Sequence, residues 1–440
     1  MPIDSIKAPA RRGHNDQAGK TIMARTRAIF SINWRRRVQQ ALTLTVLAGA
    51  LTACGGGGDS GNSGGTAATP AVSSALAPLG AAANVVPITV DFGLQGALNV
   101  PNVSVTVCAP GTSTCQTIDH VLLDTGSIGL RLTSASAAQV LSALPIATAP
   151  AGGQLAECYQ FADGYAWGTV RTADIKIGGE TASGAALQIV GDLPQTTVPA
   201  TNCVNGPAEN SPEQIGSNGI LGIGPTSADC GTTCLTLAST NYYGCPNGAS
   251  CTATTLPAAQ QVTNPVTLFP LDNNGVIVQL PAVPTTGAAT GNGVLAFGIG
   301  TQSNNPLVSG ATSYKTTSFG ALTGNYKGAA KVAFFDTGSN GYFFADSSLP
   351  LCTASPAFYC PTSLTSLSAT ITAIDGKSGT VNFNVGNLSQ LAAGGAKYAF
   401  NDIGGTFAYD SQLDFGLPFF YGKSFYVGYA TAQAEPYVAF

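Results

Sequence analysis

Two aspartates begin the same short motif at two distant places in the 440-residue chain. Asp124 opens Asp-Thr-Gly-Ser-Ile-Gly and Asp336 opens Asp-Thr-Gly-Ser-Asn-Gly, each directly after a run of apolar residues. The offset of 212 residues (336 − 124) leaves room for a whole lobe between the copies. The repeat therefore indicates a duplicated domain and not a tandem short repeat.

Each copy of the motif has the residue types that can hold one carboxylate rigidly. The apolar run predicts a buried strand, which fixes the point where the carboxylate emerges. A buried threonine hydroxyl needs a partner, a glycine lets its backbone N–H approach the carboxylate, and a serine can donate a second hydrogen bond. The residues in these supporting positions are Thr125, Gly126, Ser127, Thr337, Gly338 and Ser339.

Two such loops, related by pseudo-symmetry, can bring two carboxylates face to face. Close carboxylates cannot both ionise comfortably, so they share a proton and titrate as a pair. One of them then accepts a proton from a bound water while the other donates a proton to a carbonyl oxygen. The motifs therefore predict that Asp124 and Asp336 hydrolyse peptide bonds without a covalent intermediate.

Further segments follow the order and approximate spacing of the pepsin-like aspartic proteases, which the chain resembles over residues 85 to 440. These segments are Tyr159–Gly164, Gly168–Val170, Ile175–Gly179, Gly219–Gly224, Gly293–Gly298, Phe415–Tyr421 and Phe425–Gly428. The resemblance implies an all-β, bilobed fold of two β-barrels with a cleft between pseudo-symmetric lobes. The chain is also similar to a group of long bacterial lipoproteins of unassigned function.

The same resemblance implies roles for individual residues. Thr125 and Thr337 would brace the two loops against each other, and Tyr159 or Phe161 would cover the substrate from a hairpin flap. The chain departs from the family at the flap, because Phe161 occupies the position most like the flap tyrosine and Tyr159 lies two residues earlier on the same strand face. It departs again at Leu417, where the pepsins close with Leu-Gly-Asp. These departures bear on substrate positioning and rate more than on the fold.

Composition favours a β-rich chain and limits the available chemistry. Charged residues make up only 9%, Gly and Pro number 54 and 26, and long helical patterns are absent. Beyond the N-terminal segment the sequence has one histidine, His120, which disfavours a Ser-His-Asp hydrolase and a histidine-rich zinc hydrolase. We interpret His120 as a structural strand residue. An actin-like nucleotide-binding fold is disfavoured because helical periodicity is missing, and we expect no cofactor or metal.

Residues 1–53 are typical of a lipoprotein signal peptide. Arginines precede a short apolar stretch at 41–50, and the following Leu-Thr-Ala-Cys resembles a bacterial lipobox. Met23 is an alternative start of translation. We expect cleavage before Cys54, lipidation of that cysteine, and export to the cell envelope with anchoring in the outer membrane.

The rest of the chain divides into a flexible tether, 54–84, a first lobe with the flap, 85–300, and a second lobe, 301–440. Nine of the 18 Lys and Arg, and two of the 22 Asp and Glu, precede Cys54, so the mature charge is 9 − 20 = −11. This acidic balance argues against nucleic acid as a partner, and no basic patch suits anionic lipids. We expect a monomer with a peptide or protein substrate, attached to the membrane through its lipid.

Ten cysteines remain besides Cys54, an even number that fits disulfides in an oxidising compartment. Spacing suggests four local pairs and leaves one long-range pair. These pairs are Cys108–Cys115, Cys230–Cys234, Cys245–Cys251, Cys352–Cys360 and Cys158–Cys203. A zinc site is the rival interpretation, but the spacing lacks a repeated Cys-x-x-Cys.

Two functions are compatible with these observations. The first is a cell-envelope lipoprotein that acts as an aspartic endopeptidase, in which the two aspartates activate water. The alternative is a catalytically inactive pepsin-like surface lipoprotein that binds a peptide or protein partner. The intact motifs favour the first function. The altered flap, and the residues after Ser127 and Ser339, which differ from the usual ones of the pepsin-like family, favour the second.

Overall fold

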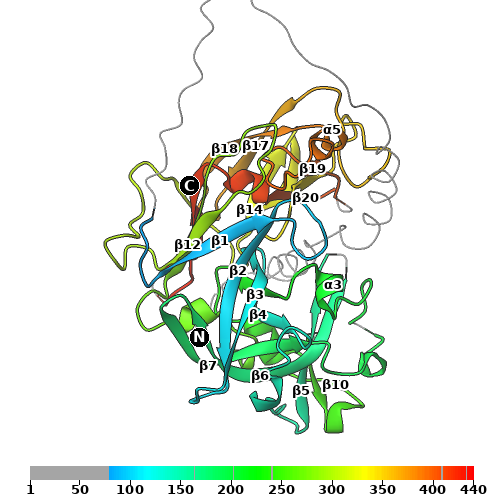
Figure 1. Ribbon diagram of the computed structural model, residues 1–440, viewed down its shortest axis with the longest axis vertical. Helices are drawn as coiled ribbons and strands as arrows, with labels where there is room; N and C mark the ends of the chain where they lie inside the picture. Colours follow the sequence, from blue (N-terminus) through cyan, green and yellow to red (C-terminus); the bar gives the residue numbers. More distant parts are fainter. Residues whose placement is uncertain (1–78, 163, 202, 239–240, 408–409, 433) are drawn as a thin grey trace, which may run out of the picture.

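The computed structural model describes residues 79–440 except 163, 202, 239–240, 408–409 and 433. The predicted signal peptide, the alternative start at Met23, the lipidation site Cys54 and most of the tether lie outside these residues. Strands dominate the described chain and its helices are short, which confirms the all-β prediction (Figure 1). Within the same residues, no helix combines the length and the apolar character needed to cross a membrane.

Six strands around the first motif close into a barrel. In order around the ring they are β2 (Val100–Cys108), β3 (Cys115–Asp124), β8 (Gly219–Ile223), β4 (Ile128–Thr133), β7 (Glu180–Val190) and β6 (Tyr165–Ile177). The ring closes because β6 pairs back with the end of β2. The alternating Val103, Val105 and Val107 of β2 are buried in the core, as the sequence pattern predicts.

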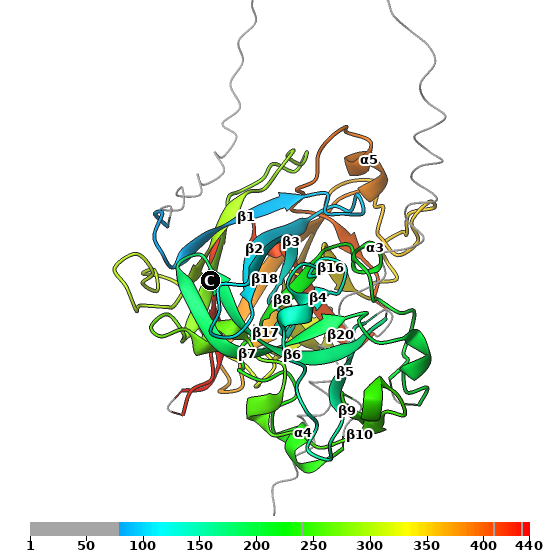
Figure 2. The same cartoon turned by 60° about the horizontal axis from the view of Figure 1, so that its bottom comes forward.

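The segment predicted to be the flap is a hairpin of β5 (Gln154–Gln160) and β6. Two short strands, β9 (Tyr242–Cys245) and β10 (Thr252–Ala253), continue the sheet beyond β5. Figure 2 shows them with the helix α4 (Gly231–Thr236) at the end of the molecule opposite α5 (Leu388–Ala392). A third short helix, α3 (Pro212–Ile215), precedes β8.

A second set of strands surrounds the second motif and forms an open half-barrel. Its order is β18 (Ser378–Val385), β17 (Thr365–Thr372), β14 (Leu322–Tyr326), β15 (Ala329–Asp336), β20 (Gln412–Gly416), β16 (Tyr342–Phe344) and β19 (Gly404–Gly405). β15 pairs with β20 in parallel and β20 pairs with β16 antiparallel. The strands β3, β8 and β4 repeat this pattern, so the two motifs lie in equivalent settings.

A third group of strands joins the two lobes (Figure 1). It consists of β1 (Val85–Asp91), β12 (Gly293–Phe297), β11 (Gly275–Leu280), β21 (Lys423–Gly428), β22 (Tyr437–Ala439) and β13 (Ser313–Lys315). β1 pairs with both β2 and β12, while β11 pairs with β21 near the end of the chain. The first and last parts of the described chain therefore meet in one sheet, which joins the closed barrel and the half-barrel into the bilobed all-β arrangement expected from the sequence.

Five disulfides staple the described chain. They join Cys108 to Cys115, Cys158 to Cys203, Cys230 to Cys234, Cys245 to Cys251, and Cys352 to Cys360. These are the pairs that the spacing suggests. Four of them close short loops, and the pair Cys158–Cys203 ties the flap strand β5 to a loop 45 residues away.

Candidate active site

The two motif aspartates stand at equivalent ends of two buried strands. β3 ends at Asp124 and β15 ends at Asp336. In each lobe a parallel neighbour places a glycine opposite the aspartate, Gly222 in the first lobe and Gly416 in the second. A Cβ at either glycine would lie 2.6 Å or less from backbone atoms of the motif loop that folds back over it. Glycine is therefore required for the loop to pass so closely.

Reciprocal hydrogen bonds between two threonines lock the motif loops together. The N–H of Thr125 donates to Thr337 Oγ1, and the N–H of Thr337 donates to Thr125 Oγ1, both at 3.0 Å. Each hydroxyl also donates across the interface to a backbone oxygen, at 2.9 Å to Phe335 and at 2.8 Å to Leu123. Because all four groups are buried, the loops cannot separate without leaving several donors and acceptors unpaired.

Within each loop, the glycine and the serine hold the carboxylate as their residue types suggest. The Gly126 N–H donates to Asp124 Oδ1 at 2.8 Å, and the Ser127 hydroxyl donates to Asp124 Oδ2. In the second loop, Gly338 N–H donates to Asp336 Oδ1 at 2.7 Å. The Ser339 hydroxyl donates to Asp336 Oδ2 at 3.0 Å.

The two carboxyl groups face each other across the motif glycines. A Cβ built on Gly126 would lie 2.5 Å from Asp336 Cγ. One built on Gly338 would lie 2.8 Å from Asp124 Oδ1 and 3.0 Å from Asp336 Oδ1, so these oxygens are no farther apart than the sum of the two distances. Both aspartates are almost fully buried, at 0% and 1% exposure. This arrangement has the residues and the symmetry of a proton-sharing carboxyl pair.

The aromatic residues of the flap lie close to this pair. The Tyr159 and Phe161 rings are in edge contact, with centroids 5.0 Å apart, and both pack with Ile220. Burial raises the pKa of the Tyr159 hydroxyl, and the charges of Asp229, Asp124 and Glu157 raise it further against the opposing effect of Arg131. Tyr159 therefore stays protonated, and it lies close enough to Asp124 for the charge of that carboxylate to affect its pKa.

A buried charge cluster beneath the flap is a feature that the sequence analysis missed. Arg131 of β4 is fully buried and donates to Glu157 Oε1 at 2.8 Å, to Asp229 Oδ2 at 2.7 Å and to the Ile128 carbonyl at 2.7 Å. Its guanidinium carbon lies 3.5 Å from the centre of the Tyr159 ring. Arg131 thereby connects the strand after the first motif to the flap strand.

Opposing electrostatic effects act on this cluster. Burial raises the pKa of Glu157 well above its usual range, although Arg131 acts in the opposite direction. Burial alone would lower the pKa of Arg131, but the charges of Glu157, Tyr159 and Asp229 raise it, so the arginine stays charged. The sequence signal was the single arginine in the apolar run Ile-Gly-Leu-Arg-Leu that follows the first motif.

Residues 80–440 match a protein family described as "Protein of unknown function (DUF3443)". The chain belongs to this family. No curated protein matches the sequence of this DUF3443 member. Among solved structures, an aspartic proteinase from Irpex lacteus is similar, with a TM-score of 0.46 and 19% identity. The similarity covers 81% of the DUF3443 chain and 97% of the proteinase.

His120 does not join the aspartate pair of the DUF3443 protein. It lies on β3 with a positive φ of 47°, and its ring nitrogens are 3.3 Å from Asp119 and 3.7 Å from Asp91. The side chain is 37% exposed.

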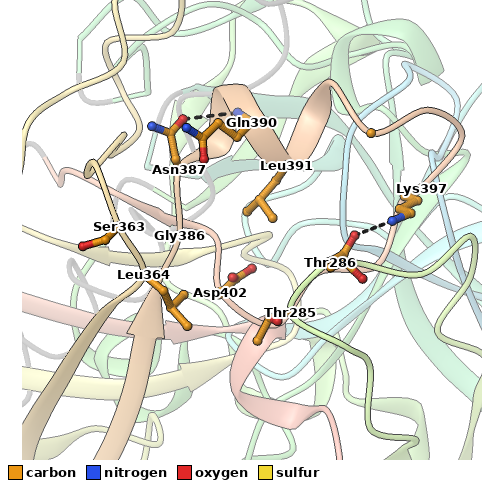
Figure 3. A pocket seen from close by; sticks show the side chains of 11 residues that line it. Thr285, Thr286, Ser363, Leu364, Gly386, Asn387, Gln390, Leu391, Lys397 and Asp402 are labelled. Atoms are coloured by element: carbon orange, nitrogen blue, oxygen red, sulfur yellow. Dashed lines mark hydrogen bonds between the residues drawn. The ribbon is translucent and has the colours of Figure 1, made fainter. Parts of the chain in front are cut away.

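A separate pocket of about 340 Å³ lies in the second lobe, beside α5 (Figure 3). None of the predicted site residues lines it. Asp402 lies at its inner wall, near Leu364 and Leu391, while Lys397 at the rim donates to the Thr286 carbonyl at 2.7 Å. Burial raises the pKa of Asp402 to about 6.

We predict that removing one hydroxyl of the threonine brace destabilises the whole protein. Thr125→Val leaves the Thr337 N–H and the Phe335 carbonyl unpaired, which should lower the free energy of unfolding by about 2 to 4 kcal/mol. Denaturant unfolding with the disulfides intact measures the change. Thr380→Val, at an exposed position of β18, is the control and should change stability by less than about 0.5 kcal/mol. Equal effects of the two variants would show that the brace is not needed.

We predict a large, pH-dependent loss of stability when the buried arginine is removed. Arg131→Met leaves two buried carboxyl groups without their cation, at a cost of about 3 to 5 kcal/mol near pH 8. The loss should shrink toward pH 5, because burial raises the pKa of Glu157 and the folded variant then binds a proton on this carboxyl. Unfolding curves at both pH values test this. Lys315→Met, which removes a surface ion pair of 3.9 Å, should change stability little at either pH.

We predict that Asp402→Asn stabilises the protein at neutral pH and not in acid. The folded pKa of about 6 lies above the unfolded value of about 3.9, so charging Asp402 lowers parental stability as the pH rises from about 4 to 6. At pH 8 the free energy of unfolding of the variant should exceed that of the parent by about 1 to 2 kcal/mol. This is less than the pKa difference alone would give, because water reaches the pocket. Unfolding at pH 4 and pH 8 measures the difference, and a constant difference would contradict the assignment.

Proposed function

We propose that this protein is an aspartic endopeptidase of the bacterial cell envelope. The observation that carries the proposal is the pair of equivalent motif loops, which hold Asp124 and Asp336 face to face and are locked by Thr125 and Thr337. Few structural roles require two carboxylates to be buried together, because their mutual repulsion and their desolvation both oppose folding. A catalytic role explains why the chain retains both.

In the proposed reaction, the pair carries one proton and one negative charge. The charged carboxylate takes a proton from a bound water while the water oxygen attacks the peptide carbonyl carbon. The protonated carboxyl gives its proton to the carbonyl oxygen, which forms a neutral tetrahedral diol. The proton taken from the water then passes to the amide nitrogen, while the other carboxylate takes a proton from one hydroxyl of the diol. The C–N bond breaks, a carboxylic acid and an amine leave, and the pair again carries one proton and one negative charge. The N–H and O–H donors of each loop keep both carboxyls oriented throughout.

The flap supplies the second part of the proposal. Tyr159 keeps its proton, so its hydroxyl can donate to a substrate group beside Asp124. The guanidinium of Arg131 lies against the ring and limits its movement. This contact would fix the distance between the flap strand β5 and the aspartate pair.

Attachment to the outer membrane through Cys54 remains part of the proposal. Five disulfides in the described chain suit an oxidising compartment outside the cytoplasm. A lipidated Cys54 and a tether of about 30 residues would hold the lobes near the membrane surface. We propose that the protein works there as a monomer on peptides or proteins, with no role in nucleic acid binding.

A second candidate is a binding protein that keeps the bilobed fold without catalysis. The observation in its favour is that Tyr159 and Phe161 are only 5% and 1% exposed, so neither ring is presented to a substrate in this arrangement of the flap. In this case a peptide or protein partner would occupy the region between the lobes and leave it uncut.

Cleavage by the full-length protein and two single variants tests the proposal. We expect the parent, purified with its disulfides intact, to generate new peptide termini from a denatured protein between pH 3 and 8. Asp124→Asn or Asp336→Asn should each reduce the rate at least about 1,000-fold, because an amide can neither take nor share the proton. Mass spectrometry of the new termini gives the rate and the cut sites.

The control is Asp402→Asn, which replaces a buried aspartate of the second lobe away from the pair and should cleave like the parent. Undiminished cleavage by Asp124→Asn or by Asp336→Asn would contradict the proposed mechanism. A folded parent that cuts nothing across this pH range would favour the binding protein.

A further inference from the structure

The two lobes differ at one position beside the aspartate pair. Ile220 of β8 pairs with Leu122, and Asp414 of β20 pairs with Phe334, each two residues before the glycine that faces the motif aspartate. The register therefore makes Ile220 and Asp414 equivalent under the pseudo-symmetry of the lobes. One lobe has an apolar side chain at this place and the other has a third carboxyl group.

Asp414 is buried in surroundings that disfavour a charge. It is 0% exposed, and neither of its carboxyl oxygens makes a hydrogen bond of ordinary geometry among the described residues, although the Ser339 hydroxyl lies close enough to act on its pKa. Its neighbours are Phe334 from β15 and Phe343 from β16, while β19 beyond them contributes only two glycines. An isolated carboxylate in such a site is costly, and a neutral carboxylic acid is much less so.

The charged and titratable groups that face Asp414 are the two motif aspartates. Burial raises the pKa of Asp414 well above its usual range, and the charge of Asp336 raises it further. The Ser339 hydroxyl opposes these effects in part, and the charge of Asp124 adds to them. No cation among the described residues lowers the pKa of Asp414, so Asp414 keeps its proton beside the pair.

Backbone contacts place β20 directly against the second motif loop. The Leu417 N–H donates to the Ser339 carbonyl at 2.7 Å, and a Cβ on Gly416 would lie 2.1 Å from the Gly341 carbonyl oxygen. Asp414 lies on the same face of β20 as Gly416, because strand side chains alternate. Its carboxyl group is thereby directed toward the loop that contains Ser339.

We propose that Asp414 is a positioning residue for the aspartate pair: its protonated carboxyl donates to the Ser339 hydroxyl, which commits its own proton to Asp336. A neutral carboxylic acid has one O–H to donate, and a serine oxygen accepts while it donates. Chains of this kind polarise each hydrogen bond in turn. No covalent bond changes, and each proton stays on its own oxygen.

The consequence is an asymmetric pair within a nearly symmetric frame. A carboxylate that accepts a stronger hydrogen bond is favoured in its charged form. Asp336 receives this support through Ser339, whereas Asp124 has Ile220 in the equivalent place. Asp336 is therefore the member that carries the negative charge, and Asp124 is the member that holds the shared proton. This catalytic consequence depends on the proposed peptidase function, but the titration of Asp414 does not.

Carbon-13 NMR of the full-length, disulfide-bonded protein labelled at its aspartate carboxyl carbons tests the proposal directly. We expect one resonance, absent from Asp414→Asn, to keep the chemical shift of a protonated acid up to pH 7. The resonances of the aspartate pair are assigned in the same way, because each disappears in Asp124→Asn or in Asp336→Asn. Asp414→Val imitates the apolar side chain of the other lobe and should move the first titration of the pair upward by about one pH unit. Asp414→Asn keeps an N–H donor and should shift the first titration of the pair much less. The control Asp402→Asn should leave this titration unchanged.

If the protein cleaves peptides, the kinetics should follow the titration. In Asp414→Val the acidic limb of the kcat profile should move upward by the same amount, so that kcat on that limb is about tenfold lower while KM stays within about twofold of the parent. A purely structural role would not shift the pH profile, and Asp414→Asn would then be impaired as much as Asp414→Val.

Two results would overturn the proposal. One is an Asp414 resonance already ionised at pH 5, and the other is a pair that titrates alike in the parent and in Asp414→Val. Should the valine variant fail to fold, the parental titration of Asp414 alone decides. A parent that cleaves nothing would remove the peptidase function, but the NMR titration would still show whether Asp414 is protonated beside the pair.

Discussion

The reciprocal hydrogen bonds between Thr125 and Thr337 are the interaction on which the rest of the structure depends. Each hydroxyl bonds to the backbone of the opposite loop, so neither lobe completes its own motif loop. The interface is also where Asp124 and Asp336 are buried, and burial next to a like charge is unfavourable. The threonine contacts offset that repulsion at the point where it acts. The fold can therefore keep a pair of carboxyls that would otherwise separate.

The frame of the site is symmetric, but its surroundings are not. In the first lobe, Arg131 forms two buried ion pairs and lies against the flap tyrosine. The second lobe has no such cation among the described residues near the pair, and places Asp414 there instead. The first lobe thus has a buried cation against the flap tyrosine, while the second lobe has a buried carboxyl group, Asp414, close to its motif aspartate. Two equivalent motif loops therefore have different neighbours in the two lobes.

Most of the fold and of the motif loops could be predicted from the sequence, because the signals for them are local. The two motifs are contiguous, the valines of β2 alternate visibly, and four disulfides close loops of eight residues or fewer. The partners of Arg131 could not be predicted, because Glu157 and Asp229 are 26 and 98 residues away and converge only when the barrel closes. Asp414 was hidden for a different reason. In the sequence it is one polar residue in a largely apolar segment, and its position becomes meaningful only when the register of β20 is compared with that of β8.

The sheet that joins the lobes also sets the order in which the protein can be completed. β11, which precedes the second lobe in sequence, has β21 as a partner, and β21 ends only twelve residues before the C-terminus. In a chain that becomes available from its N-terminus, the first barrel can form while the edge of β11 still lacks its neighbour. The loop of Asp336 and the final strands arrive last. The sheet that joins the two lobes can therefore be completed only when nearly the whole polypeptide is available to fold.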